Sequence, residues 1–307
     1  VTNKSRLSNI IKHFKVETIY HAAAYKHVPM VEFNTSEGVN NNIFGTLNCV
    51  ELSLSEEVET FVLVSTDKAV RPTNTMGATK RFSEMIVQAL STNQVNEQLP
   101  VGHKIKNEEQ KKSSETNSTR FSIVRFGNVL NSSGSVVPLF KEQIKNGGPV
   151  TVTHPEIIRY FMSIPEAVEL VIQAGAMGRK GDVFVLNMGS PIKILDIAKK
   201  LINFSGLKVK DKFNPNGDIE IKFTGLRPGE KLYEELLIGN NVTTTDNPMI
   251  MKAQEEMLPW IELLEIIKDL EKAVVESDQK MIRKLLIKAI PEFEPQTKIV
   301  DNTYQAP

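Results

Sequence analysis

The feature that most constrains the fold is an apolar run followed by a polar turn and a helical pattern. Residues 61–64 (FVLV) lead straight into residues 65–68 (STDK), and apolar residues then recur at helical spacing from 76 to about 90. In open α/β sheets, ligands bind at the carboxyl ends of buried strands. The sequence therefore predicts an α/β fold in which a hydroxyl, a carboxylate and an amine meet at a ligand-binding edge.

The same alternation of strand-like and helical segments recurs along the chain. Further strands are predicted at 16–20, 121–126, 151–153, 182–187 and 219–224, and further helices at 7–14, 136–148, 165–170, 194–204 and 257–290. Strands that alternate with helices form parallel βαβ units. Residues 226–231 (LRPGEK) are predicted to form a tight charged turn that leads into a helix through Leu236. Residues 93–119 are polar and lack a period, which is typical of an exposed loop.

The composition excludes several classes of function. The 37 basic residues balance the 37 acidic residues, so no net charge attracts nucleic acid or an anionic membrane. A single cysteine, Cys49, excludes an intrachain disulfide and is typical of a reducing compartment. The five histidines have no metal-ligand spacing, so we expect no metal site. No run approaches the roughly 18 apolar residues that span a bilayer, and nothing at the start resembles a signal peptide, so we expect this chain to be soluble and cytoplasmic.

Asp67, Lys68 and Lys80 are residue types suited to proton transfer. Lys80 lies one helical turn after Met76 and is expected on the same face of the helix. Taken alone, Asp67 and Lys68 favour a plainer reading, in which Asp67 caps the following turn and Lys68 points to solvent. The spacing to Lys80 favours a chemical site instead. Met76 has no proton to exchange, and packing in the core is its alternative interpretation.

Five segments of the chain resemble one enzyme family. They are residues 21–29 (HAAAYKHVP), 65–81 (STDKAVRPTNTMGATKR), 125–134 (RFGNVLNSSG), 147–165 (GGPVTVTHPEIIRYFMSIP) and 223–232 (FTGLRPGEKL). In this order they resemble the extended short-chain dehydrogenase/reductase superfamily, and more narrowly the CapD-like UDP-N-acetylglucosamine 4,6-dehydratases of bacterial polysaccharide biosynthesis. Methionine at position 76, where the family usually has tyrosine, is similar to the membrane-anchored branch of that group.

The resemblance implies a division of the chain. A Rossmann-like dinucleotide-binding domain is expected over residues 1–130, rejoined by about 158–189. A smaller α+β lobe for the UDP-sugar, together with C-terminal helices, is expected from 131–157 and about 190–307. Family members begin with a strand, a Gly-rich turn and two further βα units that are absent ahead of the first predicted strand here. We therefore expect weak or absent dinucleotide binding by this chain alone, and a full-length protein that is a homo-oligomer anchored on the cytoplasmic face of the inner membrane.

The resemblance also implies a reaction. UDP-N-acetylglucosamine is oxidised at C4, loses water across C5 and C6, and receives the hydride back at C6, while NAD or NADP stays tightly bound and is recycled. Asp67 is expected to be the acid for the leaving hydroxyl and Lys68 the base for the C5 proton, and a basic lysine needs a lowered pKa, which burial can supply. Because Met76 replaces the usual tyrosine, we assign removal of the C4 hydroxyl proton to Asp67, with Thr66 holding that hydroxyl.

Binding residues follow from the same resemblance. The expected cofactor contacts are Ala22, Ala23, Ala24, Asn42 and Lys80. The expected substrate contacts are Lys26 beside the sugar or nicotinamide, Asn128, Arg159 and Arg227 at the UDP half, and Glu230 facing the ribose or the arginines. Arginine suits a diphosphate because its fork bonds two oxygens at once. Read from the residues alone, Arg159 is equally an ion pair on the surface, and Arg227 a helix cap.

Two rival functions stay open at this point. A UDP-N-acetylhexosamine 4-epimerase shares the oxidation but not the elimination, and the adjacent Asp67 and Lys68 favour the dehydratase. A non-catalytic UDP-sugar-binding or assembly subunit is favoured by Met76 and by the absence of a Gly-rich turn.

Overall fold

The computed structural model describes residues 1–91, 119–235 and 242–304 of the chain. Its centre is a six-stranded sheet with the order β1-β2-β3-β8-β13-β12. The strands are β1 (Thr18–His21), β2 (Thr60–Val64), β3 (Arg120–Arg125), β8 (Asp182–Leu186), β13 (Ile250–Ala253) and β12 (Val242–Thr244). The first four are parallel, which confirms the predicted α/β fold. The other two correct it, because β13 runs antiparallel to β8, and β12 antiparallel to β13.

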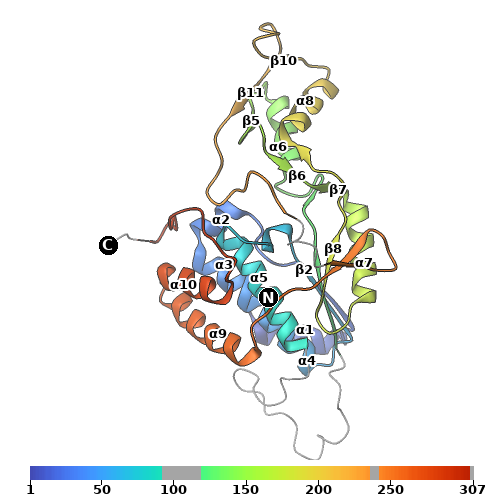
Figure 1. The fold of residues 1–307 in the computed structure, drawn as a ribbon, viewed down its shortest axis with the longest axis vertical. Helices are drawn as coiled ribbons and strands as arrows, with labels where there is room; N and C mark the ends of the chain where they lie inside the picture. The colour runs from blue at the N-terminus through green and yellow to red at the C-terminus, as the bar shows by residue number, and fades with distance from the viewer. Residues whose placement is uncertain (92–118, 236–241, 305–307) are drawn as a thin grey trace, which may run out of the picture.

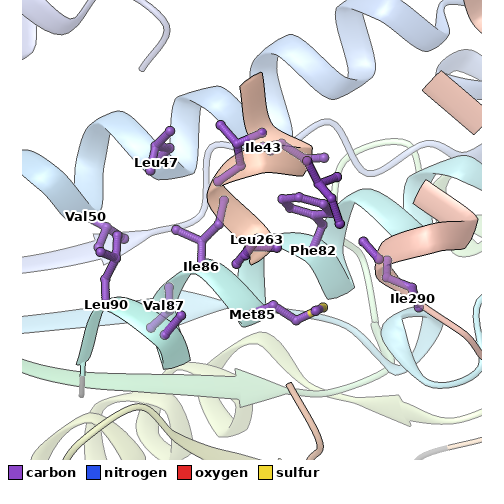
Figure 2. Close-up of a cluster of buried hydrophobic side chains, with 14 of the residues drawn as sticks. Ile43, Leu47, Val50, Phe82, Met85, Ile86, Val87, Leu90, Leu263 and Ile290 are labelled. Carbon is purple, nitrogen blue, oxygen red and sulfur yellow. The ribbon is translucent and has the colours of Figure 1, made fainter. Parts of the chain in front are cut away.

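Helices cover both faces of this large sheet (Figure 1). One face packs against α4 (Gly45–Ser55), α5 (Thr75–Ser91), α9 (Trp260–Val275) and α10 (Gln279–Ala289). The other packs against α7 (Ile164–Met177), whose Ser163 forms the capping box that starts the helix beside Pro165. Figure 2 shows side chains of α4 and α5 meeting in the first core, with Leu47 and Val50 facing Ile86 and Leu90. The polar turn after β2 therefore follows a strand that is packed between helices on both faces of the sheet.

Further helices complete this part of the molecule. They are α1 (Lys4–Phe14), α2 (Val28–Phe33), α3 (Thr35–Val39) and the π-helix η1 (Asn40–Phe44). The predicted single helix over 257–290 is instead the pair α9 and α10. They are separated at Ser277, whose φ of 53° is left-handed, and Asp278 caps the second helix by accepting from the Met281 backbone N–H.

A smaller lobe stands at one end of the elongated molecule (Figure 1). Its parallel sheet has the order β10 (Val209–Lys210), β11 (Ile219–Phe223) and β5 (Val150–Val152), and it packs with α6 (Val136–Lys145) and α8 (Ile194–Phe204). Two small ladders join the lobe to the large sheet. They are β4 (Asn128–Val129) with β7 (Phe161–Met162), and β6 (Ile158–Arg159) with β9 (Ile192–Lys193).

The C-terminal part of the chain occupies two packing environments. Residues up to β11 pack in the smaller lobe, whereas β12, β13, α9 and α10 join the large sheet and its core. The range 190–307, expected to form the lobe and C-terminal helices, therefore divides near residue 242. The predicted division of the chain into a dinucleotide-binding domain and a UDP-sugar lobe stays a proposal.

Two local predictions have a different outcome. The helix expected after residue 231 is wrong for residues 231–235, which have no regular structure; Leu236 and most of the expected loop 93–119 lie outside the described residues. Among the helices that the structure describes, none is long and apolar enough to cross a lipid bilayer.

Candidate active site

A cavity of about 430 Å³ lies where the carboxyl ends of β1, β2 and β3 meet the smaller lobe. This volume is within the usual range for small-molecule sites. The predicted site residues that line it are Ala22, Ala24, Lys26, Thr66, Lys68, Met76, Lys80, Asn128, Arg159, Arg227 and Glu230. Segments far apart in the sequence are thus brought to one place. Ala23, Asn42 and Asp67 are predicted site residues outside this lining.

The turn after β2 presents Thr66 and Lys68 to the cavity and hides Asp67 behind them. The Asp67 side chain is fully buried, and its Oδ1 accepts from the Thr66 hydroxyl and from Lys68 Nζ, both at 2.9 Å. Its Oδ2 is buried with no hydrogen-bond partner among the described residues. Gly127 gives this oxygen room, because a Cβ there would lie 2.8 Å from it. A proton can therefore reach Asp67 through the Thr66 hydroxyl.

The plainer reading of the Asp67–Lys68 pair is wrong. Thr66, not Asp67, caps the short 3₁₀-helix η2 (Asp67–Ala69), because its hydroxyl accepts from the Lys68 backbone N–H. The Lys68 side chain is only 17% exposed and bonds Asp67 instead of pointing to solvent.

Lys68 lies between two carboxylates, Asp67 at 2.9 Å and Glu234 at 3.7 Å. Burial alone would lower the pKa of Lys68, but Asp67 and Glu234 together outweigh it and raise the pKa above its usual value. This corrects the expectation that burial lowers it. Glu234 was not among the predicted site residues; the only signal for it in the sequence was its place just after the charged turn 226–231.

Met76 and Lys80 share one face of α5, as their spacing predicts, and both line the cavity. Lys80 Nζ donates to the Val64 carbonyl oxygen at 2.6 Å, at the end of β2. Burial lowers the pKa of Lys80 to about 8, against the opposing pull of Glu84. The first turn of α5 also packs directly on the turn after β2, since a Cβ at Gly77 would lie 2.2 Å from the Lys68 carbonyl oxygen.

A buried ionic network lies beneath the turn after β2. Glu84 of α5 accepts from Arg125 at 2.5 and 2.8 Å and from the Ser65 hydroxyl at 2.6 Å. Arg81 lies 3.3 Å from Glu84, and Glu255 contacts both arginines at 2.5 and 3.4 Å. Burial would raise the pKa of Glu84, but the arginines outweigh it and lower the pKa below its usual value. The first residue of the turn is thereby tied to a fixed charge cluster.

Two consecutive asparagines hold the loop after β1. Asn41 Nδ2 donates to the Ala23 carbonyl oxygen at 2.9 Å, and Asn42 bonds both the backbone N–H and the carbonyl of Tyr25 at 2.7 and 3.1 Å. Asn42 Nδ2 also donates to Thr79 Oγ1 at 2.9 Å. Consecutive asparagines are poor helix formers, and the hydrogen bonds of these two side chains give a reason for them here. Asn42 is fully buried and committed to the protein, so its contact with a cofactor stays a prediction that would require one of these bonds to open.

Arg159 is fixed by the segment that follows the charged turn. It donates to the carbonyl oxygens of Ile158 and Lys231, both at 2.7 Å, and lies 3.5 Å from Glu230 and 3.8 Å from Glu234. Because Arg159 is buried, the reading of it as a surface ion pair is wrong.

The segment 227–235 docks onto the turn after β2. Lys231 Nζ donates to the carbonyl oxygens of Val70 and Arg71 at 3.1 and 2.8 Å, and Asn74 Nδ2 donates to the Gly229 carbonyl at 3.0 Å. Arg227 is exposed at the cavity, and residues 228–235 directly after it form no helix that it could cap. The docked segment therefore brings the smaller lobe's charged residues to the Asp67–Lys68 pair.

No cluster of metal-ligating side chains occurs in the described parts of the chain. His21 at the end of β1 is buried beside the Thr46 hydroxyl at 3.0 Å. Burial, with a smaller effect of the Lys80 charge, lowers the pKa of His21 to about 3, so this histidine is neutral.

Comparisons with known proteins agree with one family. The model of the family described as polysaccharide biosynthesis protein matches residues 1–255. The capsular polysaccharide biosynthesis protein CapD of Staphylococcus aureus is 53% identical over 242 residues, which are 79% of this chain and 36% of that protein. A UDP-glucose 4-epimerase of Rickettsia rickettsii is 35% identical over 76% of this chain and 59% of its own length. The chain thus spans about a third of the length of its CapD relative.

Solved structures share the fold. Pen from Bacillus thuringiensis is 30% identical and superposes with a TM-score of 0.67 over 83% of this chain and 71% of its own. A dTDP-glucose 4,6-dehydratase from Bacillus anthracis, solved in complex with NAD, is 17% identical with a TM-score of 0.54 over 73% of this chain and 66% of its own. At that identity the likeness concerns the fold alone.

Proposed function

The chain belongs to the polysaccharide biosynthesis protein family, and we propose that it carries the catalytic site of a nucleotide-sugar 4,6-dehydratase that converts UDP-N-acetylglucosamine into a UDP-4-keto-6-deoxy-N-acetylhexosamine. The observation that carries the proposal is the buried Asp67–Lys68 pair at the carboxyl end of β2, with Lys68 on the cavity wall. Elimination of water across C5 and C6 needs one group that takes a proton and another that gives one. An adjacent carboxylate and amine meet that need.

The resident oxidant in this proposal is NAD or NADP. Ala22 and Ala24 leave the end of β1 without bulky side chains, and Lys80 offers a buried amine in the lining of the same cavity. These features fit the flat, polar nicotinamide end of a dinucleotide. When bound, the cofactor supplies a reversible hydride acceptor for the C4 position. The NAD complex of a protein with the same fold agrees with this assignment.

The proton of the C4 hydroxyl passes to Asp67 by way of Thr66. The Thr66 hydroxyl lines the cavity and donates to Asp67 Oδ1, so it can take a proton from the sugar while it gives its own to the carboxylate. Asp67 then carries the proton that later leaves with the C6 hydroxyl as water. This route gives Met76 no proton to transfer, and its buried side chain forms an apolar part of the cavity wall.

Lys68 takes the proton from C5, and it can do so only as a neutral amine. While Asp67 is ionised, the pKa of Lys68 is raised and the amine is charged. Protonation of Asp67 in the oxidation step removes the nearer of the two attractions, so burial then acts to lower the pKa of Lys68. The oxidation of C4 thereby prepares the base for the elimination.

The UDP half is proposed to lie toward the smaller lobe. The guanidinium of Arg159 is held by the carbonyl oxygens of Ile158 and Lys231, and Arg227 reaches the same cavity from the charged turn. Two arginines suit a diphosphate. Asn128, Glu230 and Lys26 complete the proposed contacts with the nucleotide and the sugar.

A 4-epimerase is the second candidate. It needs the same C4 oxidation but no elimination, and the 35% identical Rickettsia relative bears that name. Lys68, as the base for the C5 proton, has no task in a simple epimerisation, which is why the dehydratase is preferred.

The decisive test is incubation of the intact protein with NAD and UDP-N-acetylglucosamine in deuterated water, followed by NMR of the product. A 4-keto-6-deoxy sugar with deuterium at C5 supports the dehydratase. A C4-epimerised alcohol overturns it in favour of the epimerase, and UDP-sugar binding without turnover favours a binding subunit. Lys68→Ala should abolish dehydration while UDP binding stays close to wild type, because the arginines are untouched. Lys272→Ala, on the exposed face of α9, is the matched control.

A further inference from the structure

Glu234 is a buried carboxylate next to Lys68 that the proposed dehydratase chemistry has not used. We propose that Glu234 is a positioning residue that accepts a proton from Lys68, so that Lys68 can act as a neutral base at C5, and returns this proton when the cycle ends. This inference rests on the proposed function and deepens it.

The geometry of Glu234 supports such a role. Its side chain is 2% exposed, its Oε1 lies 3.7 Å from Lys68 Nζ, and its Oε2 is buried with no hydrogen-bond partner among the described residues. An ionised carboxylate prefers to have its lone pairs bonded. The unbonded Oε2 is therefore an atom of Glu234 that can bind a proton. A separation of 3.7 Å is beyond a hydrogen bond of about 2.9 Å, and a small rotation of Lys68 closes it once Asp67 no longer holds the amine.

Counting protons shows why a second carboxylate is needed. At rest, Asp67 is ionised and Lys68 is charged. Oxidation of C4 places the hydroxyl proton on Asp67, so Asp67 has no free site for a proton of Lys68. Lys68 must still lose a proton before it can break the C5–H bond. Transfer from Lys68 Nζ to Glu234 breaks one N–H bond, forms one O–H bond and leaves an amine beside a carboxylic acid.

The remaining steps balance without any further reactant. The Lys68 amine takes the C5 proton, and Asp67 gives its proton, by way of the Thr66 hydroxyl, to the C6 hydroxyl, which leaves as water. After hydride returns to C6, Lys68 gives a proton back to C5 and then recovers its original proton from Glu234. All three side chains end in their starting states.

Glu230 does not offer the same chemistry. It is bonded to the Arg227 backbone N–H and to the Thr153 hydroxyl, is more exposed, and faces Arg159 at 3.5 Å. The charged groups that face Lys68 are Asp67, Glu234 and, from β6, Arg159. Arg159 also lies 3.8 Å from Glu234, so it keeps that carboxylate in place beside the lysine.

The first test measures the Lys68 proton without turnover. The intact protein is labelled with acetic anhydride across a pH series, and modification of Lys68 is read by mass spectrometry. In Glu234→Gln, the pH of half-maximal labelling should fall by about 1–3 pH units, because an opposite charge in contact with Lys68 is removed. Glu235→Gln is the matched control, since Glu235 is the next residue and is ion-paired with the exposed Arg71; its midpoint should stay at the wild-type value.

The second test reads catalysis. In Glu234→Gln, kcat at neutral pH should fall roughly 10- to 100-fold and recover as the pH rises, because solvent must then remove the Lys68 proton, while KM for the UDP-sugar changes little. Glu234→Asp keeps the carboxylate but places it farther from Lys68, so its kcat should lie between those of the wild type and Glu234→Gln. This variant replaces Glu234→Gln in the test if the glutamine variant folds poorly.

The outcomes separate the two proposals. An unchanged labelling midpoint in both Glu234 variants overturns the role of Glu234, as does a lower kcat with an unaltered pH profile. A shifted midpoint in a protein that makes no 4-keto sugar keeps the control of Lys68 by Glu234 and rejects the dehydratase.

Discussion

The buried pair of Glu84 and Arg125 gives the sharpest test of how the site is supported. Replacing Arg125 with methionine keeps the length of the side chain but leaves Glu84, which is fully buried, with only Arg81 at 3.3 Å and the Ser65 hydroxyl at 2.6 Å. Removing one partner of a buried ion pair costs about 3–5 kcal/mol, because the other charge stays buried without compensation. We expect Arg125→Met to lower the free energy of unfolding by about 4 kcal/mol.

The thermal shift follows from the size of the chain. An unfolding entropy of about 2.1 cal/mol/K per residue gives roughly 0.6 kcal/mol/K for 307 residues, so a loss of about 4 kcal/mol lowers Tm by about 6 °C. Urea unfolding followed by circular dichroism measures the free energy, and a thermal scan measures Tm. Arg120→Met is the control, because Arg120 lies on the same strand with its side chain exposed; it should change stability by less than about 1 kcal/mol.

A double variant separates loss of charge pairing from loss of packing. Glu84→Gln combined with Arg125→Met removes both charges, so it should recover at least about 2 kcal/mol relative to the sum of the single variants. Recovery is incomplete, since Arg81 loses Glu84 and keeps Glu255, at 3.4 Å, as its remaining ion-pair partner among the described residues. Additive single effects, or an Arg125→Met cost below about 1 kcal/mol, would refute the reasoning.

Two further predictions concern α5. Gly77→Ala should reduce kcat at least about 10-fold and UDP binding little, because a Cβ 2.2 Å from the Lys68 carbonyl oxygen must displace the turn that carries the proposed proton-transfer groups. Isothermal titration with UDP and product NMR measure the two effects, and normal turnover would contradict the close packing. The pKa of Lys80 is about 8 in the folded chain and 10.5 ordinarily, so the unfolded chain binds more protons between these two pH values. The stability of the wild type should therefore rise relative to that of Lys80→Met as the pH rises through this window. Urea unfolding at pH 7 and pH 10 checks the sign, and a fall relative to the variant would contradict it.

Short-range sequence patterns predict the part of the site that lies on helices and strands and in the turn after β2. The apolar run of β2, the polar turn after it and the four-residue spacing of Met76 and Lys80 are short-range features, and the structure has all of them as expected. The two antiparallel strands β12 and β13, which are three and four residues long, were missed. Strands this short carry too few residues for an alternating pattern to separate strand from loop, so β5, which is equally short, was predicted while these two were not.

The parts that sequence reasoning missed depend on contacts between distant residues. The burial of Asp67 depends on the absence of a side chain at Gly127, and the place of Glu234 depends on the bonds from Lys231 to Val70 and Arg71. The segment that holds Glu234 has no helical or strand period, so no local pattern predicts its position. The raised pKa of Lys68 follows from the same contacts, since Asp67 and Glu234 are the groups that raise it against burial.

In the proposed mechanism, the docked segment couples substrate binding to proton transfer. Within a few residues it holds the carbonyl of Lys231 that fixes Arg159 and the carboxylate of Glu234 that faces Lys68. Any substitution in this segment that moves the backbone will change both the proposed diphosphate contact of Arg159 and the charge beside Lys68. A fall in kcat together with a rise in KM therefore cannot be assigned to either residue. Within this segment, a substitution that alters the charge of Glu234 and leaves Arg159 in place should shift the pH dependence of kcat without changing KM. The pH profile and the labelling midpoint of Lys68 are therefore the measurements on which the assignment of Glu234 depends.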